Sequence, residues 1–324
     1  MSISELRRNP ITKRWVVIAT SRGKRHAESE RCPFCPGNEG ETEKTILAYP
    51  PSPGGEWQAR VFPNKFLAFA IEGELEKRKD GIFRSMNGRG AHEVITARAH
   101  KTMYELLPHE IANLLFAARE RMIDLRKAVD EHGMPKLECI AIFGNEGPAA
   151  GASKSHAHWQ LIGLPIIPHE WQDEYRNCEE HWDNENECLF CRLTAEERER
   201  GTRIIAENEY YLSLCDGTGR FPFETWILPV RHMPLFEHAD DRTIAALADM
   251  IGDTLARIGK ALAYPAFNLY FHNAPMYDRT RDRYYHSHIK IVPRLTQPAG
   301  FELGTGFFIN PMAPEEAARI LRTL

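Results

Sequence analysis

Residues 151–160 read Gly151-Ala152-Ser153-Lys154-Ser155-His156-Ala157-His158-Trp159-Gln160. An apolar, Pro-free run continues to Leu164 and predicts a β-strand. Side chains two residues apart on a strand share a face, so His156, His158 and Gln160 form one polar stripe. A small-residue loop, 147–153, precedes it, and its backbone can approach a phosphate closely. A nucleophilic imidazole beside a neutral amide donor suits phosphoryl-type group transfer through a covalent histidine intermediate.

The surroundings of this stripe occur twice in the chain. The first copy comprises Cys32-Pro-Phe-Cys35, His100 and His156-Ala-His158, and the second comprises Cys188-Leu-Phe-Cys191, His232 and His286-Ser-His288. The lone histidine precedes the His-x-His pair by 56 residues in the first copy and by 54 in the second. So close a match indicates an internal duplication.

Each copy contains one long amphipathic helix, because apolar residues recur with a period of about 3.6 residues. The two sets are Ile111, Leu114, Leu115, Ala118, Met122, Leu125 and Val129, and Ile244, Leu247, Ile251, Leu255, Ile258 and Leu262. Pro108 and the pair Asp240-Asp241 are helix start signals.

Strand-like runs flank both helices. They cover residues 15–19, 66–71, 92–96, 137–143, 211–214, 225–228 and 267–271. The predicted fold class is therefore α+β, with two tandem units that each carry an antiparallel sheet and one long helix. We place an N-terminal catalytic domain at residues 1–175 and a C-terminal domain at 176–324, with the boundary in the charged, strand-poor stretch 170–187.

Composition limits the classes of function. The chain has 324 residues, a net charge of −4 and 43% hydrophobic residues, values typical of a globular protein and not of a nucleic-acid-coating one. Residues 1–20 lack an apolar signal-peptide core, and no apolar run approaches the roughly 20 residues of a membrane span. We expect a cytoplasmic protein whose partners are small molecules, not nucleic acid or membranes.

The cysteines and histidines of the duplicated motif suit metal binding. Two thiolates and two imidazoles make a closed tetrahedral set that zinc prefers. The predicted ligands are Cys32, Cys35, His100 and His156 in one site and Cys188, Cys191, His232 and His286 in the other. A redox pair is the weaker reading, because a redox Cys-x-x-Cys belongs at a helix start in a βαβ unit. Four protein ligands leave no open position, so both zinc sites are predicted to be structural.

His158 remains outside the metal set and is the candidate nucleophile. A strand histidine alone is often structural, but here a metal ligand, an amide and a small-residue loop surround it. Its counterpart His288 has Lys290 in place of Gln160, so we predict that only the first half is catalytic. His272 either lines a pocket or is structural.

These motifs resemble the galactose-1-phosphate uridylyltransferase family, a branch of the histidine-triad superfamily. The resemblance covers nearly the whole chain and includes further segments in the family's order. They are Arg8-Asn9-Pro10, Arg22-Gly-Lys-Arg25, Arg60-Val-Phe-Pro-Asn64, Ala99-His100-Lys101, Asn145-Glu-Gly147 and Ala299-Gly-Phe-Glu302. The resemblance implies that both units are histidine-triad-like and that the protein is a homodimer.

The resemblance also implies a double displacement in which His158 holds a nucleotidyl group. Gln160 and Ser153 are then catalytic donors to the phosphoryl oxygens. The implied substrate-binding residues are Arg22, Arg25, Phe62, Asn64, Asn145, Gly151 and Glu302. The implied substrates are a nucleoside-diphosphate sugar and a sugar 1-phosphate or phosphate.

Two departures keep the substrates open. Lys65 follows Asn64 where well-studied bacterial members carry an acidic residue, and no glutamine follows Glu302 closely. The second Cys-x-x-Cys is more like a two-zinc branch that includes an ADP-glucose phosphorylase. The leading prediction is a UDP-glucose:hexose-1-phosphate uridylyltransferase of galactose metabolism, and the alternative is an ADP-glucose:phosphate adenylyltransferase. A nucleotide-sugar hydrolase and a non-catalytic zinc module are weaker alternatives.

Overall fold

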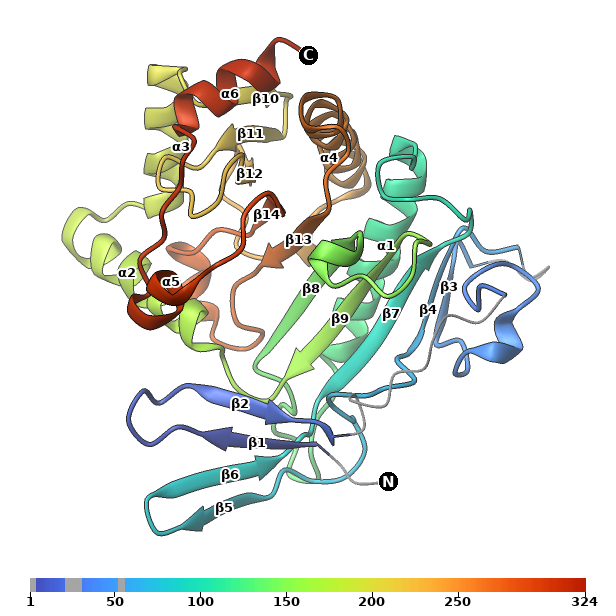
Figure 1. The fold of residues 1–324 in the computed structure, drawn as a ribbon. Coiled ribbons are helices and arrows are strands. Elements are labelled where there is room, and N and C mark those ends of the chain that lie inside the picture. Colours follow the sequence, from blue (N-terminus) through green and yellow to red (C-terminus); the bar gives the residue numbers. More distant parts are fainter. Residues whose placement is uncertain (1–3, 21–30, 52–55) are drawn as a thin grey trace.

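The computed structural model describes residues 4–20, 31–51 and 56–324, and within them it contains two sheets and six α-helices (Figure 1). The helices are α1 (Pro108–Leu125), α2 (His169–Glu185), α3 (Leu189–Arg200), α4 (Asp241–Leu262), α5 (Gly300–Thr305) and α6 (Pro314–Arg322). Short 3-10 helices are η2 (Glu39–Glu41), η3 (Pro148–Ala150), η4 (Phe236–His238) and η5 (Arg279–Arg283).

The larger sheet has ten strands, all antiparallel to their neighbours. Its first-half strands are β3 (Leu47–Tyr49), β4 (Ala59–Pro63), β7 (Ala91–Ala97), β8 (Cys139–Glu146) and β9 (His158–Leu164). Its second-half strands are β10 (Ile204–Glu207), β11 (Tyr211–Cys215), β12 (Thr225–Pro229), β13 (Phe267–His272) and β14 (His288–Pro293). The predicted α+β class with antiparallel sheets is confirmed.

The two halves meet where β8 pairs with β13, from Phe143 opposite Tyr270 to Glu146 opposite Phe267. Outward from this seam, the order is β8, β9, β7, β4, β3 on one side and β13, β14, β12, β11, β10 on the other. Corresponding strands thus occupy corresponding places, as a duplication requires. One continuous sheet spans both halves, and the division at residues 175/176 stays a prediction.

The two long helices cover one face of this sheet and pack against each other. Pro108 opens α1, and the Asp240 carboxylate caps α4 by accepting from the Thr243 N–H at 2.8 Å. The apolar residues of both helices are buried with strand residues such as Ile95 and Ile291. The helix prediction is wrong at one end, because α1 stops at Leu125 and Val129 lies beyond it.

The opposite face differs between the halves. Over the second half, α2 and α3 bury Trp171, Tyr175 and Phe190 against strands β11 and β12. Figure 1 shows both helices beside the second-half strands, at a distance from β9 and β7. The stretch 170–187, expected to lack strands, is largely helix α2. Over the first half this face carries a cavity.

The smaller sheet joins the N-terminal hairpin to a later one in the order β2-β1-β6-β5. Its strands are β1 (Glu5–Arg8), β2 (Trp15–Ile18), β5 (Lys77–Asp80) and β6 (Phe83–Asn87). The strand predicted at 66–71 is wrong, since only Ala70 makes a bridge there. In this segment the N–H groups of Phe66 and Ala68 donate to the side chains of Asn64 and His92 at 2.9 and 3.0 Å, and not to a neighbouring strand.

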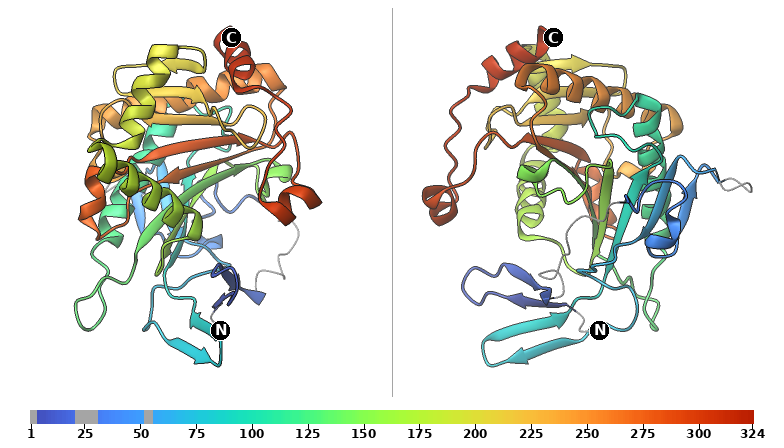
Figure 2. Two further views of the ribbon diagram at one scale, coloured as in Figure 1. Left: turned by 90° about the vertical axis from the view of Figure 1, so that its left-hand side faces the viewer. Right: turned by 45° about the vertical axis from the view of Figure 1, so that its right-hand side comes forward.

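The C-terminal segment leaves the body before it returns. Figure 2 shows α5 projecting from the sheet while α6 lies back against the second half. Four large apolar side chains of this arm are exposed: Phe301, Leu303, Phe307 and Ile309. None of the helices in the described ranges is both long and apolar enough to span a bilayer.

Candidate active site

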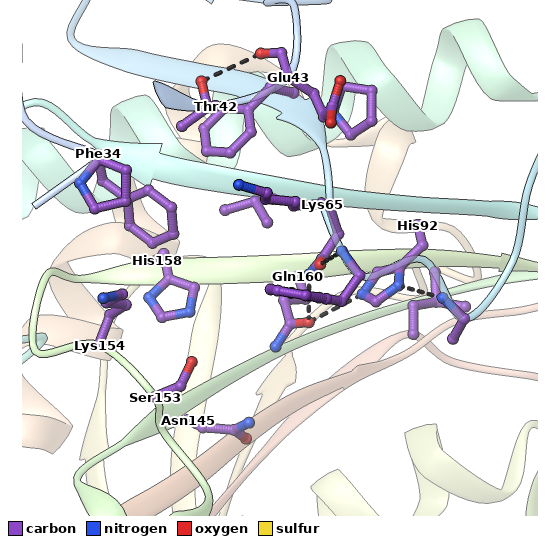
Figure 3. A pocket seen from close by; sticks show the side chains of 18 of the residues that line it. Phe34, Thr42, Glu43, Lys65, His92, Asn145, Ser153, Lys154, His158 and Gln160 are labelled. Atoms are coloured by element: carbon purple, nitrogen blue, oxygen red, sulfur yellow. Dashed lines mark hydrogen bonds between the residues drawn. The ribbon is translucent and has the colours of Figure 1, made fainter. Parts of the chain in front are cut away.

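A cavity of about 420 Å³ lies on the open face of the first half (Figure 3). Predicted residues that line it are Phe62, Asn64, Asn145, Gly151, Ser153, His158 and Gln160. Their side chains come from β4, β8, β9 and the connecting loops, so the fold gathers segments almost a hundred residues apart. Glu302 lies on α5 and does not line the cavity, and its carboxylate accepts from the Ala299 N–H at 2.9 Å. Arg22 and Arg25 lie outside the described residues.

His158 presents one unprotonated ring nitrogen to this cavity. Its Nδ1–H donates to the His156 carbonyl oxygen at 2.8 Å, which leaves the lone pair on Nε2. The side chain is largely buried, and burial lowers its pKa although the His156 carbonyl opposes the shift. The Phe34 ring packs edge-on against the imidazole at 5.1 Å. The ring is therefore held as a neutral, oriented imidazole, the form in which a histidine can act as a nucleophile.

The Gln160 side chain lies beside His158 with its oxygen turned inward. Oε1 accepts from Asn64 Nδ2 at 3.3 Å and from His92 Nε2 at 3.0 Å. Figure 3 shows His92 on the far side of Gln160 from His158. Sequence reasoning missed His92, because a single histidine in an apolar strand has no local signal for a site.

The second half supports the cavity through Asn268 on β13. Its Nδ2 donates to the Asn145 side-chain oxygen at 2.8 Å and to the Ala150 carbonyl at 2.9 Å. The Asn145 oxygen is thereby engaged from outside the cavity. Sequence reasoning missed Asn268 too, since it acts across the β8–β13 seam.

The small-residue loop is a tight turn whose two glycines, Gly147 and Gly151, have φ of 78° and 84°. The N–H groups of Ala150 and Ala152 donate to the Gly147 carbonyl at 3.2 and 3.1 Å. These donors shape the turn and are not aimed at a ligand. Gly151 and Ala152 of the loop line the cavity, as do the side chains of Ser153 and Lys154.

The first predicted metal set comes together beside His158. The Cys35 sulfur lies 3.1 Å from His100 Nδ1, and the Cys32 sulfur lies 3.5 Å from His156 Nδ1. A sulfur and a nitrogen on one tetrahedral zinc ion lie about 3.5 Å apart. His156 Nε2–H donates to the Ala97 carbonyl at 2.8 Å, and burial lowers its pKa to about 4, so Nδ1 is available as a neutral ligand.

The second set repeats this geometry. The Cys191 sulfur lies 3.5 Å from His232 Nδ1 and 3.8 Å from His286 Nδ1. His286 Nε2 faces the Pro229 carbonyl at 3.1 Å, as His156 faces Ala97. In each set, the two cysteine sulfurs and the two histidine nitrogens lie within 4.8 Å of one another. Both sets can hold a metal ion.

A third group, Glu174, His272 and His288, is also compact enough for a cation. Here Lys290 already donates to Glu174 at 2.9 Å, and His272 Nδ1 lies 2.7 Å from the same carboxylate. Burial alone would raise the pKa of Glu174, but the charges of these neighbours hold it well below its usual range. His272 thus belongs to a buried ion-pair cluster of the second half and does not line the first-half cavity.

Comparison with known proteins agrees with this architecture. Residues 74–324 match a protein family described as "Domain of unknown function (DUF4921)". An ADP-glucose phosphorylase of Arabidopsis thaliana is 29% identical, the alignment covering 98% of this chain and 92% of the relative. A galactose-1-phosphate uridylyltransferase of Thermotoga maritima is 28% identical over 98% of each chain.

Solved structures give the same result. The crystal structure of an ADP-glucose phosphorylase from Arabidopsis thaliana with bound ADP-glucose superposes with a TM-score of 0.79 at 28% identity, over 99% of each chain. A uridylyltransferase structure superposes with a TM-score of 0.84 at 25% identity, over 98% of each chain. The predicted resemblance is confirmed, and both kinds of transferase are among the relatives.

Proposed function

The chain belongs to the DUF4921 family, and from this premise we propose that it is a nucleotidyltransferase that carries the nucleotidyl group on His158. The observation that carries the proposal is the His158 ring itself, which lies outside both Cys/His sets and has an unprotonated Nε2 at a cavity of about 420 Å³. Relatives at 28–29% identity that cover nearly the full chain are nucleotidyltransferases, which supports the same class.

In the first half-reaction, His158 Nε2 attacks the α-phosphorus of a nucleoside-diphosphate sugar. An N–P bond forms, and the bond from phosphorus to the bridging oxygen breaks and releases a sugar 1-phosphate. The Nδ1–H bond to the His156 carbonyl stabilises the positive charge that the ring then carries. In the second half-reaction, a phosphate oxygen of the acceptor attacks the same phosphorus and returns the electron pair to Nε2.

Negative charge develops on the phosphoryl oxygens in both steps. Gln160 and Ser153 line the cavity beside His158, and we assign them as donors to these oxygens. Lys65 and Lys154 also line it and add positive charge where a diphosphate binds. Phe62, Asn64, Asn145 and Gly151 are proposed to contact the nucleoside and ribose.

Two donors fit the relatives. UDP-glucose, with a hexose 1-phosphate as acceptor, follows from the family motifs and from uridylyltransferase relatives. ADP-glucose, with phosphate as acceptor, is favoured by the Arabidopsis enzyme, which matches in both sequence and structure. The departures at Lys65 and after Glu302 set this chain apart from the well-studied bacterial uridylyltransferases, and its second Cys-x-x-Cys resembles the branch that includes an ADP-glucose phosphorylase.

We propose that both Cys/His sets bind zinc. A structural zinc ion in such a set stabilises its fold by roughly 10 kcal/mol or more. The first site anchors the start of β9, since His156 is a ligand and lies two residues before His158. Neither site takes part in the transfer step, because four protein ligands leave no open coordination position.

We further propose a homodimer in which the C-terminal arm contacts the second copy. The arm exposes Phe301, Leu303 and Phe307, side chains that a lone chain in water leaves without a covering surface. Because the predicted substrate residue Glu302 lies on this arm and does not line the cavity of its own chain, we propose that it reaches the cavity of the second copy. Light scattering on the wild type and on a Phe301→Asp, Leu303→Asp variant tests this, and a wild-type monomer would contradict it.

Intact-mass analysis tests the function directly. The zinc-loaded protein is incubated with UDP-glucose or ADP-glucose, and the expected result is one nucleotidyl mass added at His158. A chase with galactose 1-phosphate or phosphate should remove this mass and yield the matching product. If neither sugar nucleotide labels the chain, the proposal fails. Label lost to water faster than to either acceptor would instead favour a hydrolase, and a binding-only zinc module would show no label at all.

A further inference from the structure

His92 on β7 is buried beside the cavity, with only 2% of its surface exposed. The transfer mechanism above leaves it without a role. Both of its ring nitrogens make hydrogen bonds: Nδ1 with the Ala68 backbone N–H at 3.0 Å, and Nε2 with the Gln160 side chain at 3.0 Å.

These contacts fix the proton on the His92 ring. A backbone N–H can only donate, so His92 Nδ1 must accept, and the single proton of a neutral imidazole is then on Nε2. Nε2–H in turn must donate, so the Gln160 atom that faces it must be the amide oxygen. The amide NH2 of Gln160 is left to face the cavity.

Asn64 leads independently to the same orientation. Its Oδ1 accepts from the Phe66 backbone N–H at 2.9 Å, so its Nδ2 is the group that meets Gln160 Oε1 at 3.3 Å. The Gln160 oxygen thus receives two donors from inside the fold. The His92 contact is the shorter of the two and is the more enclosed.

We infer that His92 is a positioning residue whose Nε2–H holds the Gln160 amide with its NH2 toward the reacting phosphoryl group. The inference rests on the proposed function and deepens it. If the Gln160 amide rotates by half a turn, its oxygen faces the phosphoryl oxygens. It then repels the negative charge that the NH2 group would stabilise. The residue that contacts the reacting group depends on the groups behind it that hold its orientation. Substituting such a supporting group commonly changes the rate tenfold to a hundredfold.

Two substitutions separate the two hydrogen bonds. In His92→Asn, the Asn oxygen can replace Nδ1 and keep the Ala68 bond, but no donor reaches Gln160. In His92→Gln, the Gln nitrogen can replace Nε2 and keep the bond to Gln160, but the Ala68 bond is lost. The readout is the single-turnover rate of His158 nucleotidylation, by quenched intact mass, with whichever of UDP-glucose and ADP-glucose labels the wild type.

We expect His92→Asn to be about tenfold to a hundredfold slower, and His92→Gln to remain within about threefold of the wild type. A purely structural role for His92 in anchoring the segment 64–70 predicts the opposite order. In a Gln160→Ala background, adding His92→Asn should change the rate by less than about twofold, because the group it positions is gone. Zinc content and the thermal midpoint should stay near those of the parent chains.

Several results would overturn the inference. One is a His92→Asn variant that is nucleotidylated as fast as the wild type, and another is an equal loss of rate in His92→Asn and His92→Gln. A third is that His92→Asn slows the reaction by the same factor in the Gln160→Ala background as in the wild type. If His92→Asn does not fold, ¹⁵N-histidine spectra of the wild type decide, and a proton on Nδ1 of His92 overturns it. A wild type that no sugar nucleotide labels removes the proposed function together with this inference, whereas failure of the inference alone leaves the wild type labelled.

Discussion

His158 and His288 hold matching positions in the two halves, yet their surroundings differ. Each ring donates Nδ1–H to the carbonyl two residues earlier, at 2.8 and 3.1 Å, and each packs against the phenylalanine of its Cys-x-x-Cys motif. His158 faces a cavity of about 420 Å³, whereas the His288 ring is enclosed by the rings of Phe190, Trp226 and His272. His288 Nε2 has no hydrogen-bond partner in the described part of the chain.

The difference comes from what fills the open face of the sheet. Val94 lies opposite Gln160 in the first half, and Trp226 lies opposite Lys290 in the second, where its ring stacks on His288 at 5.1 Å. Helix α2 also adds Glu174 to the second half. The same backbone therefore makes a cavity beside His158 and packs side chains around His288, according to the size of a few side chains.

Substituting the two matching histidines, His158 and His288, should produce the largest difference between the halves. His158→Ala is expected to reduce nucleotidyl transfer by at least about 10⁴-fold, because the covalent step is lost. His288→Ala should leave the transfer rate within about threefold and cost about 1–3 kcal/mol of stability through the cavity it creates. Single-turnover kinetics and thermal unfolding measure both. A comparable rate loss in the two variants would contradict the assignment of the chemistry to the first half.

Substituting one histidine ligand in each metal site gives the second test of the difference between the halves. His156→Ala and His286→Ala should each remove one zinc ion per chain and lower the free energy of unfolding by at least about 4 kcal/mol. Only His156→Ala should also slow transfer, because it loosens the strand that carries His158. Zinc determination by mass spectrometry, unfolding curves and labelling rates test this. Full zinc content in either variant would show that its histidine is not a ligand.

Lys290→Gln copies the first-half residue into the second half. It removes the buried cation from the half-buried Glu174 carboxylate, and we expect a loss of about 3 kcal/mol in the free energy of unfolding. No labelling of His288 should appear, since Trp226 still covers that ring. Peptide mapping after incubation with the sugar nucleotide tests this, and a nucleotidyl group on His288 would show that Lys290 alone closes the second site.

The smallest expected effect concerns Asn268, which reaches from one half to the other. Asn268→Leu removes two hydrogen bonds, to Asn145 and Ala150, and should lower kcat/KM for the donor about tenfold. Asn208→Leu is the matched control, because Asn208 also bonds a carbonyl, that of Ala246, but lies away from the cavity. If both variants keep wild-type kcat/KM, the second half does not assist the site through Asn268.

Local patterns were sufficient to predict much of this architecture. The two-residue period placed His158 and Gln160 on one face of β9, although His156 lies before that strand. The repeated cysteines and histidines predicted two metal sets that the fold does assemble. Trp171, Tyr175 and Cys178 also follow a helical spacing that would have predicted α2. The charge of that stretch hid the pattern.

The supporting residues could not be predicted this way. His92 reaches Gln160 from a strand 68 residues earlier, and Asn268 reaches Asn145 from 123 residues later. Both contacts depend on strand order and on the β8–β13 seam, and neither leaves a periodic trace in the sequence. The strand predicted at 66–71 is wrong because the apolar content of this segment hides the fact that the N–H groups of Phe66 and Ala68 donate to side chains.

The seam between β8 and β13 bears on how the chain can be cut. In a fragment that ends after β9, β8 would be an edge strand in which Phe143 to Glu146 lack their pairing partners on β13. Such a fragment should aggregate or dimerise through this edge when it is expressed alone. It should be soluble when it is expressed together with the other half. Although the two halves repeat the same motifs, neither half is expected to be stable as a separate chain.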